Sequence, residues 1–162
     1  MAHDETFERS VEIAAPVEDV FAFHLDTRNA ASISPRGTRI TDVTGRFPVM
    51  PGALVTMRMR QLPVPVGVTW RVRIAAVEPP RRIVDVAERS PFRAWRHEHL
   101  FQPLGPGRTL MSDRVTYRLP LGALGRLAAP LVRRQLAHAF AQRHRLTRDL
   151  LEARAREAAG AA

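Results

Sequence analysis

Cysteine and lysine are both absent from this chain of 162 residues. Without cysteine there is no disulfide bond, no thiolate nucleophile and no thiolate metal ligand. Without lysine, all 25 basic residues are arginine, and against 16 acidic residues they give a formal charge of +9. The arginines are scattered and form no block of like charge. We therefore attribute the charge to residue usage and expect no specific nucleic-acid partner.

Signals of several other protein classes are missing too. No apolar run approaches the roughly 18 residues of a membrane helix, because Arg126, Arg133 and Arg134 interrupt the most apolar C-terminal stretch. The N-terminal MAHDETFERS is acidic and polar, unlike a secretory signal. There is neither a Gly-rich phosphate loop nor a GxSxG motif, so nucleotide hydrolysis and a nucleophile-elbow hydrolase have no support. We expect a cytoplasmic protein.

Length and composition predict one folded domain spanning residues 1–162. Hydrophobic residues make up 45% and charged residues 25% of the chain, which is typical of a soluble globular protein. No interior stretch has the composition of a linker between two domains. We expect order from about residue 5 to residue 157 and fraying of the Ala-rich tail beyond it. Nothing in the sequence indicates an oligomeric state.

Alternation and turn residues predict the order of the elements. A half-buried strand at 6–13 is followed by a short helix after Ala15-Pro16 and a second one near 29–33. Six further strands, separated by glycine and proline, form an antiparallel meander: 38–44, 53–62, 67–78, 82–88, 93–102 and 108–119. A long helix follows from about Leu131 to Arg156, with Pro130 at its start. Its apolar stripe comprises Val132, Leu136, Ala139, Phe140, Arg143, Leu146 and Leu150.

This order of elements resembles the helix-grip fold of the START-like superfamily called SRPBCC. The opening VEIAAPVEDVFAF is similar to that of polyketide cyclase/dehydrase-type and coenzyme Q-binding members. The segment FRAWRHEHLFQPLGPGRTLMSDRVTYRLPLGALGRL is similar to the last hairpin and helix lead-in of bacterial ligand-binding members. The resemblance implies an α+β fold of the Bet v 1/START type, in which a seven-stranded antiparallel sheet wraps around the C-terminal helix. It also implies a hydrophobic ligand cavity, and it carries over no catalytic residue.

Two neighbouring strands have apolar inner faces that suit such a cavity. Alternation puts Met57 and Met59 on one face of the third strand, and Trp70 and Val72 on one face of the fourth. Arginines and threonines occupy the opposite faces. Methionine and tryptophan adapt well to a flat or flexible apolar ligand. The same pattern also fits a filled core, so both readings stay open here.

The most informative strand carries Trp95, His97, His99 and Phe101 on one face. The hairpin that follows brings Met111, Asp113 and Tyr117 of the last strand opposite this face, if the register keeps like faces together. His97 or His99 then meets Asp113, and such a pair either orients a ligand or works as acid and base. We favour the orienting role. Arg9 of the first strand is also expected to reach Asp113.

The pair His97-x-His99 with a nearby carboxylate also resembles two-His, one-carboxylate metal ligation. No third ligand is indicated in the sequence, so we expect no metal and no other cofactor. His24, His138 and His144 occur in helical segments without metal spacing, and we expect them to be packing or surface residues.

These observations predict a protein that binds a hydrophobic small molecule, such as a lipid, a quinone or a polyketide-like compound, without catalysis. Two alternatives remain: a cyclase or dehydratase that uses His97, His99 and Asp113 as proton shuttles, and a lipid carrier whose Arg-rich helix face makes weak contact with anionic membranes. The expected ligand-binding residues are Arg9, Met57, Met59, Trp70, Val72, Trp95, His97, His99, Phe101, Met111, Asp113, Tyr117 and Phe140.

Overall fold

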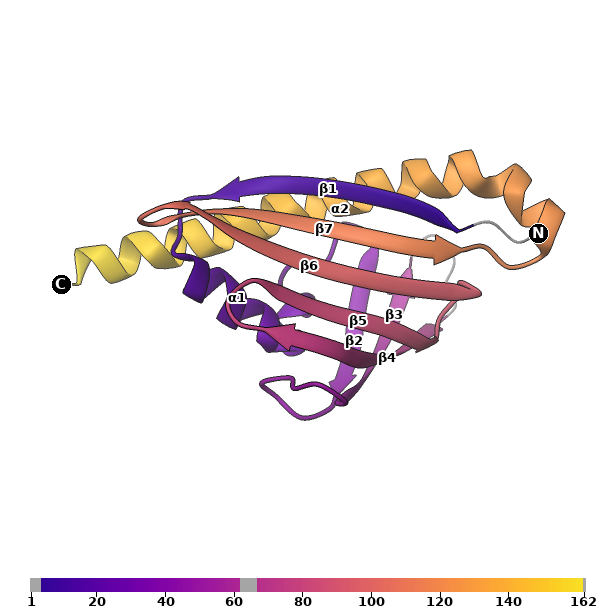
Figure 1. Ribbon diagram of the computed structural model, residues 1–162, viewed down its shortest axis with the longest axis horizontal. Helices are drawn as coiled ribbons and strands as arrows, with labels where there is room; N and C mark the ends of the chain where they lie inside the picture. The colour runs from indigo at the N-terminus through magenta and orange to yellow at the C-terminus, as the bar shows by residue number, and fades with distance from the viewer. Residues whose placement is uncertain (1–3, 62–66, 162) are drawn as a thin grey trace.

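The computed structural model describes residues 4–61 and 67–161 (Figure 1). One antiparallel sheet contains all seven strands in the order β1-β7-β6-β5-β4-β3-β2. The strands are β1 (Glu5–Ile13), β2 (Thr38–Thr44), β3 (Leu54–Gln61), β4 (Gly67–Glu78), β5 (Arg82–Arg89), β6 (Ala94–Gly105) and β7 (Arg108–Arg118). The helices are α1 (Val17–Leu25), the short 3-10 helix η1 (Thr27–Ala31) and α2 (Gly122–Gly160).

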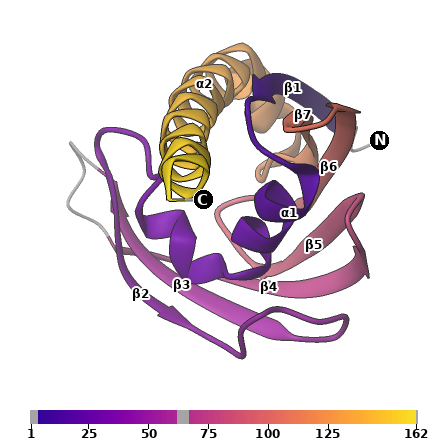
Figure 2. The same cartoon turned by 90° about the vertical axis from the view of Figure 1, so that its left-hand side faces the viewer.

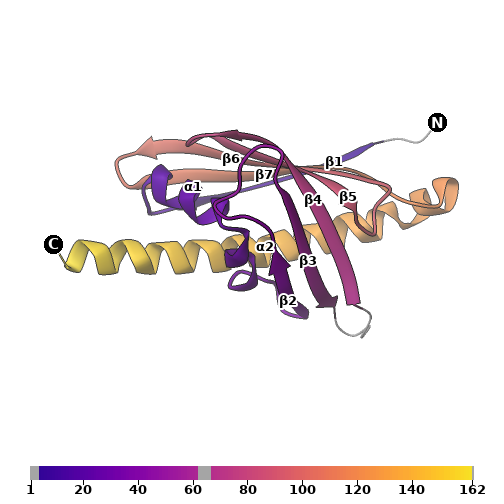
Figure 3. The ribbon, with the colours of Figure 1, turned by 90° about the horizontal axis from the view of Figure 1, so that it is seen from below.

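The sheet curls around α2, which crosses its concave side, as Figures 2 and 3 show from two directions. β1 pairs with β7, so the first strand closes the meander next to the last one. α1 and η1 lie at one end of the concave side, between β1 and β2 in the chain. This arrangement confirms the expected α+β helix-grip fold.

The C-terminal helix starts earlier than the sequence predicts. α2 begins at Gly122, and Pro130 lies inside it instead of at its start. Proline lacks a backbone N–H, so it removes one helical hydrogen bond without ending the helix here. The Ala-rich tail also remains helical as far as Gly160.

Smaller differences concern two other expected elements. The second short helix spans Thr27–Ala31 and not 29–33, because the Asp26 side chain accepts a hydrogen bond from the N–H of Arg28 and so caps a 3-10 turn two residues earlier. Residue 62, the expected end of the third strand, lies outside the described residues.

The face that α2 turns to the sheet is shifted relative to the predicted stripe. Phe140, His144, Thr147 and Leu151 are buried, whereas Leu146 is 36% exposed. The buried residues recur at three- and four-residue steps, as a helix face requires. The predicted stripe therefore missed a histidine and a threonine that belong to the core.

The outer face of the sheet is charged, as its alternation predicts. Arg71 and Arg73 both pair with Glu88 across β4 and β5. Arg114 of β7 donates to Glu8 of β1 at 2.9 Å. None of the helices in the described part of the chain combines the length and the apolar character needed to cross a membrane.

Candidate functional site

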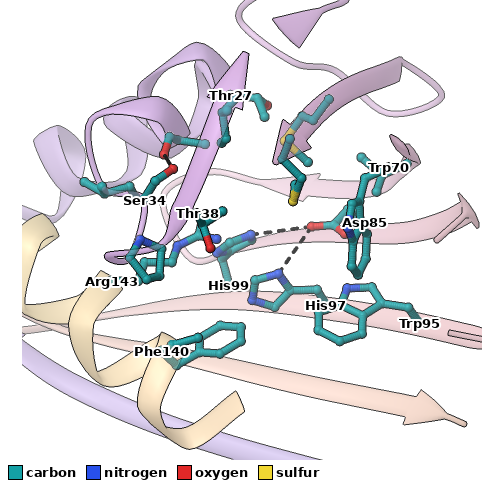
Figure 4. A pocket seen from close by; sticks show the side chains of 18 of the residues that line it. Thr27, Ser34, Thr38, Trp70, Asp85, Trp95, His97, His99, Phe140 and Arg143 are labelled. Atoms are coloured by element: carbon teal, nitrogen blue, oxygen red, sulfur yellow. Dashed lines mark hydrogen bonds and ion pairs between the residues drawn. The ribbon is translucent and has the colours of Figure 1, made fainter. Parts of the chain in front are cut away.

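A cavity of about 430 Å³ lies between α2 and the concave face of the sheet. Its walls come from β3, β4, β5 and β6 on one side and from α2 on the other, and α1, η1 and the start of β2 complete it. The inner faces of β3 and β4 therefore line this cavity, although Val55, Val72 and Ile74 also pack together in an apolar core cluster. Figure 4 shows the side chains around it.

One part of the wall is aromatic and apolar. The Trp70 and Trp95 rings meet edge to face with centroids 4.9 Å apart, and Phe92 lies 4.7 Å from Trp95. Phe140 of α2 closes this part from the helix side. Met57, Met59 and Val72 line the neighbouring surface. The predicted cavity residues of β3, β4 and α2 thus lie together.

A polar part of the wall is built by β5 and β6. His97 and His99 are two residues apart on β6, so both point inward, and their ring centroids are 4.0 Å apart. Asp85 of β5 lies beside them because β5 pairs with β6 in a register that sets Asp85 opposite His97. Asp85 Oδ2 is 3.6 Å from His97 Nδ1 and 3.5 Å from His99 Nε2. All three residues line the cavity.

Asp113 lies behind the two histidines and contacts three imidazoles. His97 Nε2–H donates to Asp113 Oδ1 at 3.0 Å, and His144 Nε2–H of α2 donates to Oδ2 at 2.6 Å. His99 Nδ1 is 2.8 Å from Oδ1, although its alignment is that of an ion pair and not of a hydrogen bond. Asp113 is 1% exposed, so these contacts replace its hydration.

The contacts within this network shift the pKa values of its members in different directions. Burial would raise the pKa of the Asp113 carboxyl, but the charges of His99 and His97 and the hydrogen bond from His144 hold it well below its usual range. Burial lowers the pKa of His99, yet the Asp113 carboxylate and Asp85 outweigh that effect and raise it to about 9. Burial and the charge of His99 lower the pKa of His97. A protonated imidazole therefore adjoins a neutral one at the cavity wall.

Two further polar groups line the cavity without protein partners among the described residues. His24 Nδ1–H donates to the carbonyl of Val20 at 2.7 Å, which leaves the buried Nε2 as an unpaired acceptor. Burial and the charge of His99 lower the pKa of His24 to about 3, so this ring is neutral. The Nε of Arg143 is a buried donor that also lacks a partner.

The structure places eight of the thirteen predicted binding residues in the cavity wall and five elsewhere; two of these five are Asp113, which lies behind the histidines, and Arg9. Phe101 and Met111 pack into the apolar core around α1, and Tyr117 packs against Phe7 and Phe140. These three side chains lie on the inward faces of β6 and β7, but α1, β1 and α2 cover them. They are therefore core residues and not part of the described cavity wall.

The expected contact between Arg9 and Asp113 is wrong. β1 does place Arg9 opposite Asp113, yet Arg9 is exposed and no ion pair joins the two in the described part of the chain. β1 is an edge strand, so its arginine can turn to solvent. Asp113 also has both oxygens occupied by histidines.

Asp85, His24 and His144 belong to the site although the sequence pattern did not indicate them as site residues. Asp85 occupies an inner-face position of its strand, and a charged residue there is a signal that alternation could have flagged. His144 is one helical turn from Phe140, which gives it the same face. His24 and His144 were expected to be packing or surface residues, but they lie in the cavity wall and in the Asp113 network respectively. His138 is exposed, as one of those two readings allowed.

Comparisons with solved structures show the same fold at low sequence identity. Protein CV1439 from Chromobacterium violaceum superposes with a TM-score of 0.73 at 18% identity, covering 91% of this chain and 97% of that one. The di-domain ARO/CYC StfQ from the steffimycin biosynthetic pathway gives 0.75 at 20% identity, covering 97% of this chain and 52% of that one. Norcoclaurine synthase from Thalictrum flavum, in complex with dopamine and hydroxybenzaldehyde, gives 0.67 at 12% identity over 93% and 88%.

The sequence itself identifies the family. No curated protein matches the chain. The profile of the family described as "Polyketide cyclase / dehydrase and lipid transport" matches residues 4–152, which includes every strand, α1 and most of α2. The chain therefore belongs to the polyketide cyclase/dehydrase and lipid transport family.

Proposed function

We propose that the protein binds an apolar, ring-bearing small molecule in the cavity, with an oxygen substituent of that molecule held at the wall of Asp85, His97 and His99. One observation carries the proposal: a cavity of about 430 Å³ combines an aromatic part with a polar part. Cavities of roughly 300–1,000 Å³ with a few convergent polar groups are typical of small-molecule sites.

The aromatic part favours a flat ligand. Trp70, Trp95 and Phe92 form a cluster of contacting rings that lines the cavity. A planar ring system stacks against such a cluster, and Met57 and Met59 adjust to its outline because their side chains are unbranched. A quinone or a polyketide-like ring fits this surface.

The polar part favours an oxygen-bearing substituent. The protonated His99 and the unpaired Nε of Arg143 are donors, and His24 Nε2 is an acceptor. Buried polar atoms rarely lack hydrogen-bond partners in folded proteins. A carbonyl or hydroxyl group of a ligand would be the hydrogen-bond partner of these unpaired atoms. The family description, which covers polyketide cyclases and lipid transport, agrees with such a ligand.

The proposal is tested by what the native protein carries. Both tryptophans of the chain line the cavity, so an occupant changes the intrinsic fluorescence directly. We expect native mass spectrometry of freshly purified protein to detect a stoichiometric apolar compound, and anilinonaphthalene sulfonate to compete with it and quench the tryptophans. Denaturing extraction then identifies the compound.

A steric variant with a matched control makes the test specific. Ala139→Phe puts a ring into the cavity from α2, whereas Ala128→Phe adds the same ring at an exposed position of that helix. We expect Ala139→Phe to abolish binding with the fold retained and Ala128→Phe to bind as the wild type. Equal binding by the two variants would refute the cavity as the binding site.

A second candidate, acid–base catalysis, is favoured by the opposed pKa shifts of His97 and His99. Enzymes that use two titratable groups as acid and base often shift their pKa values in opposite directions. The discriminating experiment incubates the recovered compound with the protein and follows its mass. Conversion that His97→Ala abolishes supports catalysis, and a compound that stays unchanged supports binding alone.

A further inference from the structure

The space between Asp85, His97 and His99 has the shape of a metal site. Asp85 Oδ2, His97 Nδ1 and His99 Nε2 lie within 4.8 Å of one another, and the dashed lines of Figure 4 converge on Asp85 from both rings. The sequence alone indicated no third ligand beside the two histidines. Asp85, which comes from the neighbouring strand, supplies it.

The distances fit a bound ion better than direct hydrogen bonds. Asp85 Oδ2 is 3.6 Å from His97 Nδ1 and 3.5 Å from His99 Nε2. These separations exceed the length of a good N–H···O bond. Two atoms bound at about 2.1 Å to a tetrahedral ion lie roughly 3.4 Å apart. Both separations from Asp85 Oδ2 therefore match those between two ligands of one ion, and all three ligand atoms lie within 4.8 Å of one another.

Asp113 holds both histidines in the orientation that ligation needs. It contacts His97 through Nε2 and His99 through Nδ1, which are the ring nitrogens on the side away from Asp85. A carboxylate next to the N–H of a histidine fixes the tautomer and leaves the other nitrogen free to bind a metal. His144 in turn holds the second oxygen of Asp113 at 2.6 Å.

We propose that Asp85, His97 and His99 bind a divalent first-row transition-metal ion at the wall of the cavity. Two imidazoles and one carboxylate favour ions such as Zn²⁺, Fe²⁺ or Co²⁺ over Mg²⁺, which prefers oxygen ligands alone. The carboxylates of Asp85 and Asp113 balance the charge of the ion. All three ligands line the cavity, so the remaining coordination position of the ion faces the cavity. There the ion can hold water or an oxygen of a bound molecule.

The test is a metal titration of tag-free, chelator-treated protein without any organic ligand, so its failure leaves the proposed small-molecule binding untouched. Calorimetry with Zn²⁺ measures stoichiometry and affinity, and visible absorption with Co²⁺ reports the ligand geometry. We expect one saturable site per chain that excess Mg²⁺ does not block. Absence of saturable binding for both ions would overturn the proposal.

Variants decide whether the bound ion sits at these residues. We expect Asp85→Asn and His99→Ala to abolish binding, and Asp113→Asn to weaken it about 10–100-fold, the usual effect of losing a carboxylate that orients a ligand histidine. His138→Ala removes an exposed histidine of α2 and is expected to bind as the wild type.

Circular dichroism identifies a variant that fails to fold. Asp85→Asn is nearly isosteric at a half-buried position, so we expect this variant to fold. If His99→Ala does not fold, Asp85→Asn alone tests whether the ion binds at these residues. Ion binding that persists in folded Asp85→Asn with wild-type affinity and Co²⁺ spectrum would contradict the assignment.

Discussion

Asp113 is 1% exposed and lies within 3.0 Å of nitrogens from three histidines. Two of those histidines belong to β6 and the third to α2, so this one carboxylate connects the sheet with the helix. It also sets the protonation of the wall, because its charge is a main reason why the pKa of His99 is raised. Stability and site chemistry thus depend on the same side chain.

Replacing Asp113 by asparagine removes this charge with little change of volume. We expect Asp113→Asn to lower the free energy of unfolding by about 3–5 kcal/mol, the usual cost of breaking a buried ion pair from one side. We also expect the pKa of His99 to fall from about 9 in the metal-free protein. Urea denaturation measures the first effect and NMR titration of the imidazoles the second. The exposed Asp149→Asn serves as the control, and equal effects of the two variants would refute the role of Asp113.

His24 gives the stability a dependence on pH. Burial and the charge of His99 lower the pKa of His24 from 6.5 to about 3 in the folded protein. Between these values the unfolded chain binds a proton on His24 that the folded chain does not, so the free energy of unfolding decreases as the pH falls from 6.5 towards 3. We expect His24→Asn to make this decrease shallower in urea denaturation across that range. If the free energy of unfolding of His24→Asn decreases with falling pH as steeply as that of the wild type, His24 is not the source of the pH dependence. The same conclusion follows if the exposed His138→Asn makes the decrease equally shallow.

Among the elements, the strands were the most predictable from the sequence. In β4 apolar and polar residues alternate from Val68 to Ile74, and in β3 they alternate from Val55 to Arg60, so a period of two leaves one choice of inner face in each strand. The helix was less predictable, because an inner face that contains His144 and Thr147 does not stand out by hydrophobicity. Pro130 is also ambiguous, since proline is favoured in the first turn of a helix and still occurs inside a long one.

The same logic explains which parts of the site were foreseen. His97, His99 and Asp113 belong to one hairpin, so its register alone brings them together. Asp85 reaches the site from the next strand through the β5–β6 register. His144 reaches it from α2, so its contact depends on how the sheet curls around the helix. Local periodicity carries no information on that curvature.

The start of α2 depends on a close approach at Gly125. A Cβ at this position would lie 2.2 Å from the carbonyl oxygen of Pro120, so the backbone would have to move. We expect Gly125→Ala to lower the free energy of unfolding by about 1–3 kcal/mol, the usual cost of overpacking. Gly160→Ala at the far end of α2 meets open space and is expected to be neutral. Urea denaturation compares the two, and equal stabilities would count against the close packing.

At the scale of the whole molecule, positive charge and exposed leucines lie together near the start of α2. Leu127 is 80% exposed and Leu131 60%, and the exposed Arg133 and Arg134 follow them. The whole chain carries a formal charge of +9, and we predict weak contact between this end and anionic lipid. We expect weak sedimentation with phosphatidylserine vesicles that high salt abolishes, because salt screens exposed charges.

The lipid contact has its own control. Leu127→Ser should reduce the sedimentation, whereas Leu104→Ser, in the β6–β7 hairpin at the opposite end of the molecule (Figure 1), should not. Equal binding to neutral phosphatidylcholine vesicles, or none to either kind, would exclude an electrostatic membrane contact.

The position of the cavity divides the molecule into two parts that are held together differently. α2 packs on β1 and is tied to β7 through His144 and Asp113, but it faces β3 and β4 across the cavity. In the empty protein, the edge formed by β2, β3 and β4 should therefore open locally at a lower free energy than the rest. An occupant touches both parts and makes their unfolding one cooperative event. Amide hydrogen exchange should then slow mainly in β3 and β4 when the cavity is filled, and little in β1 and β7.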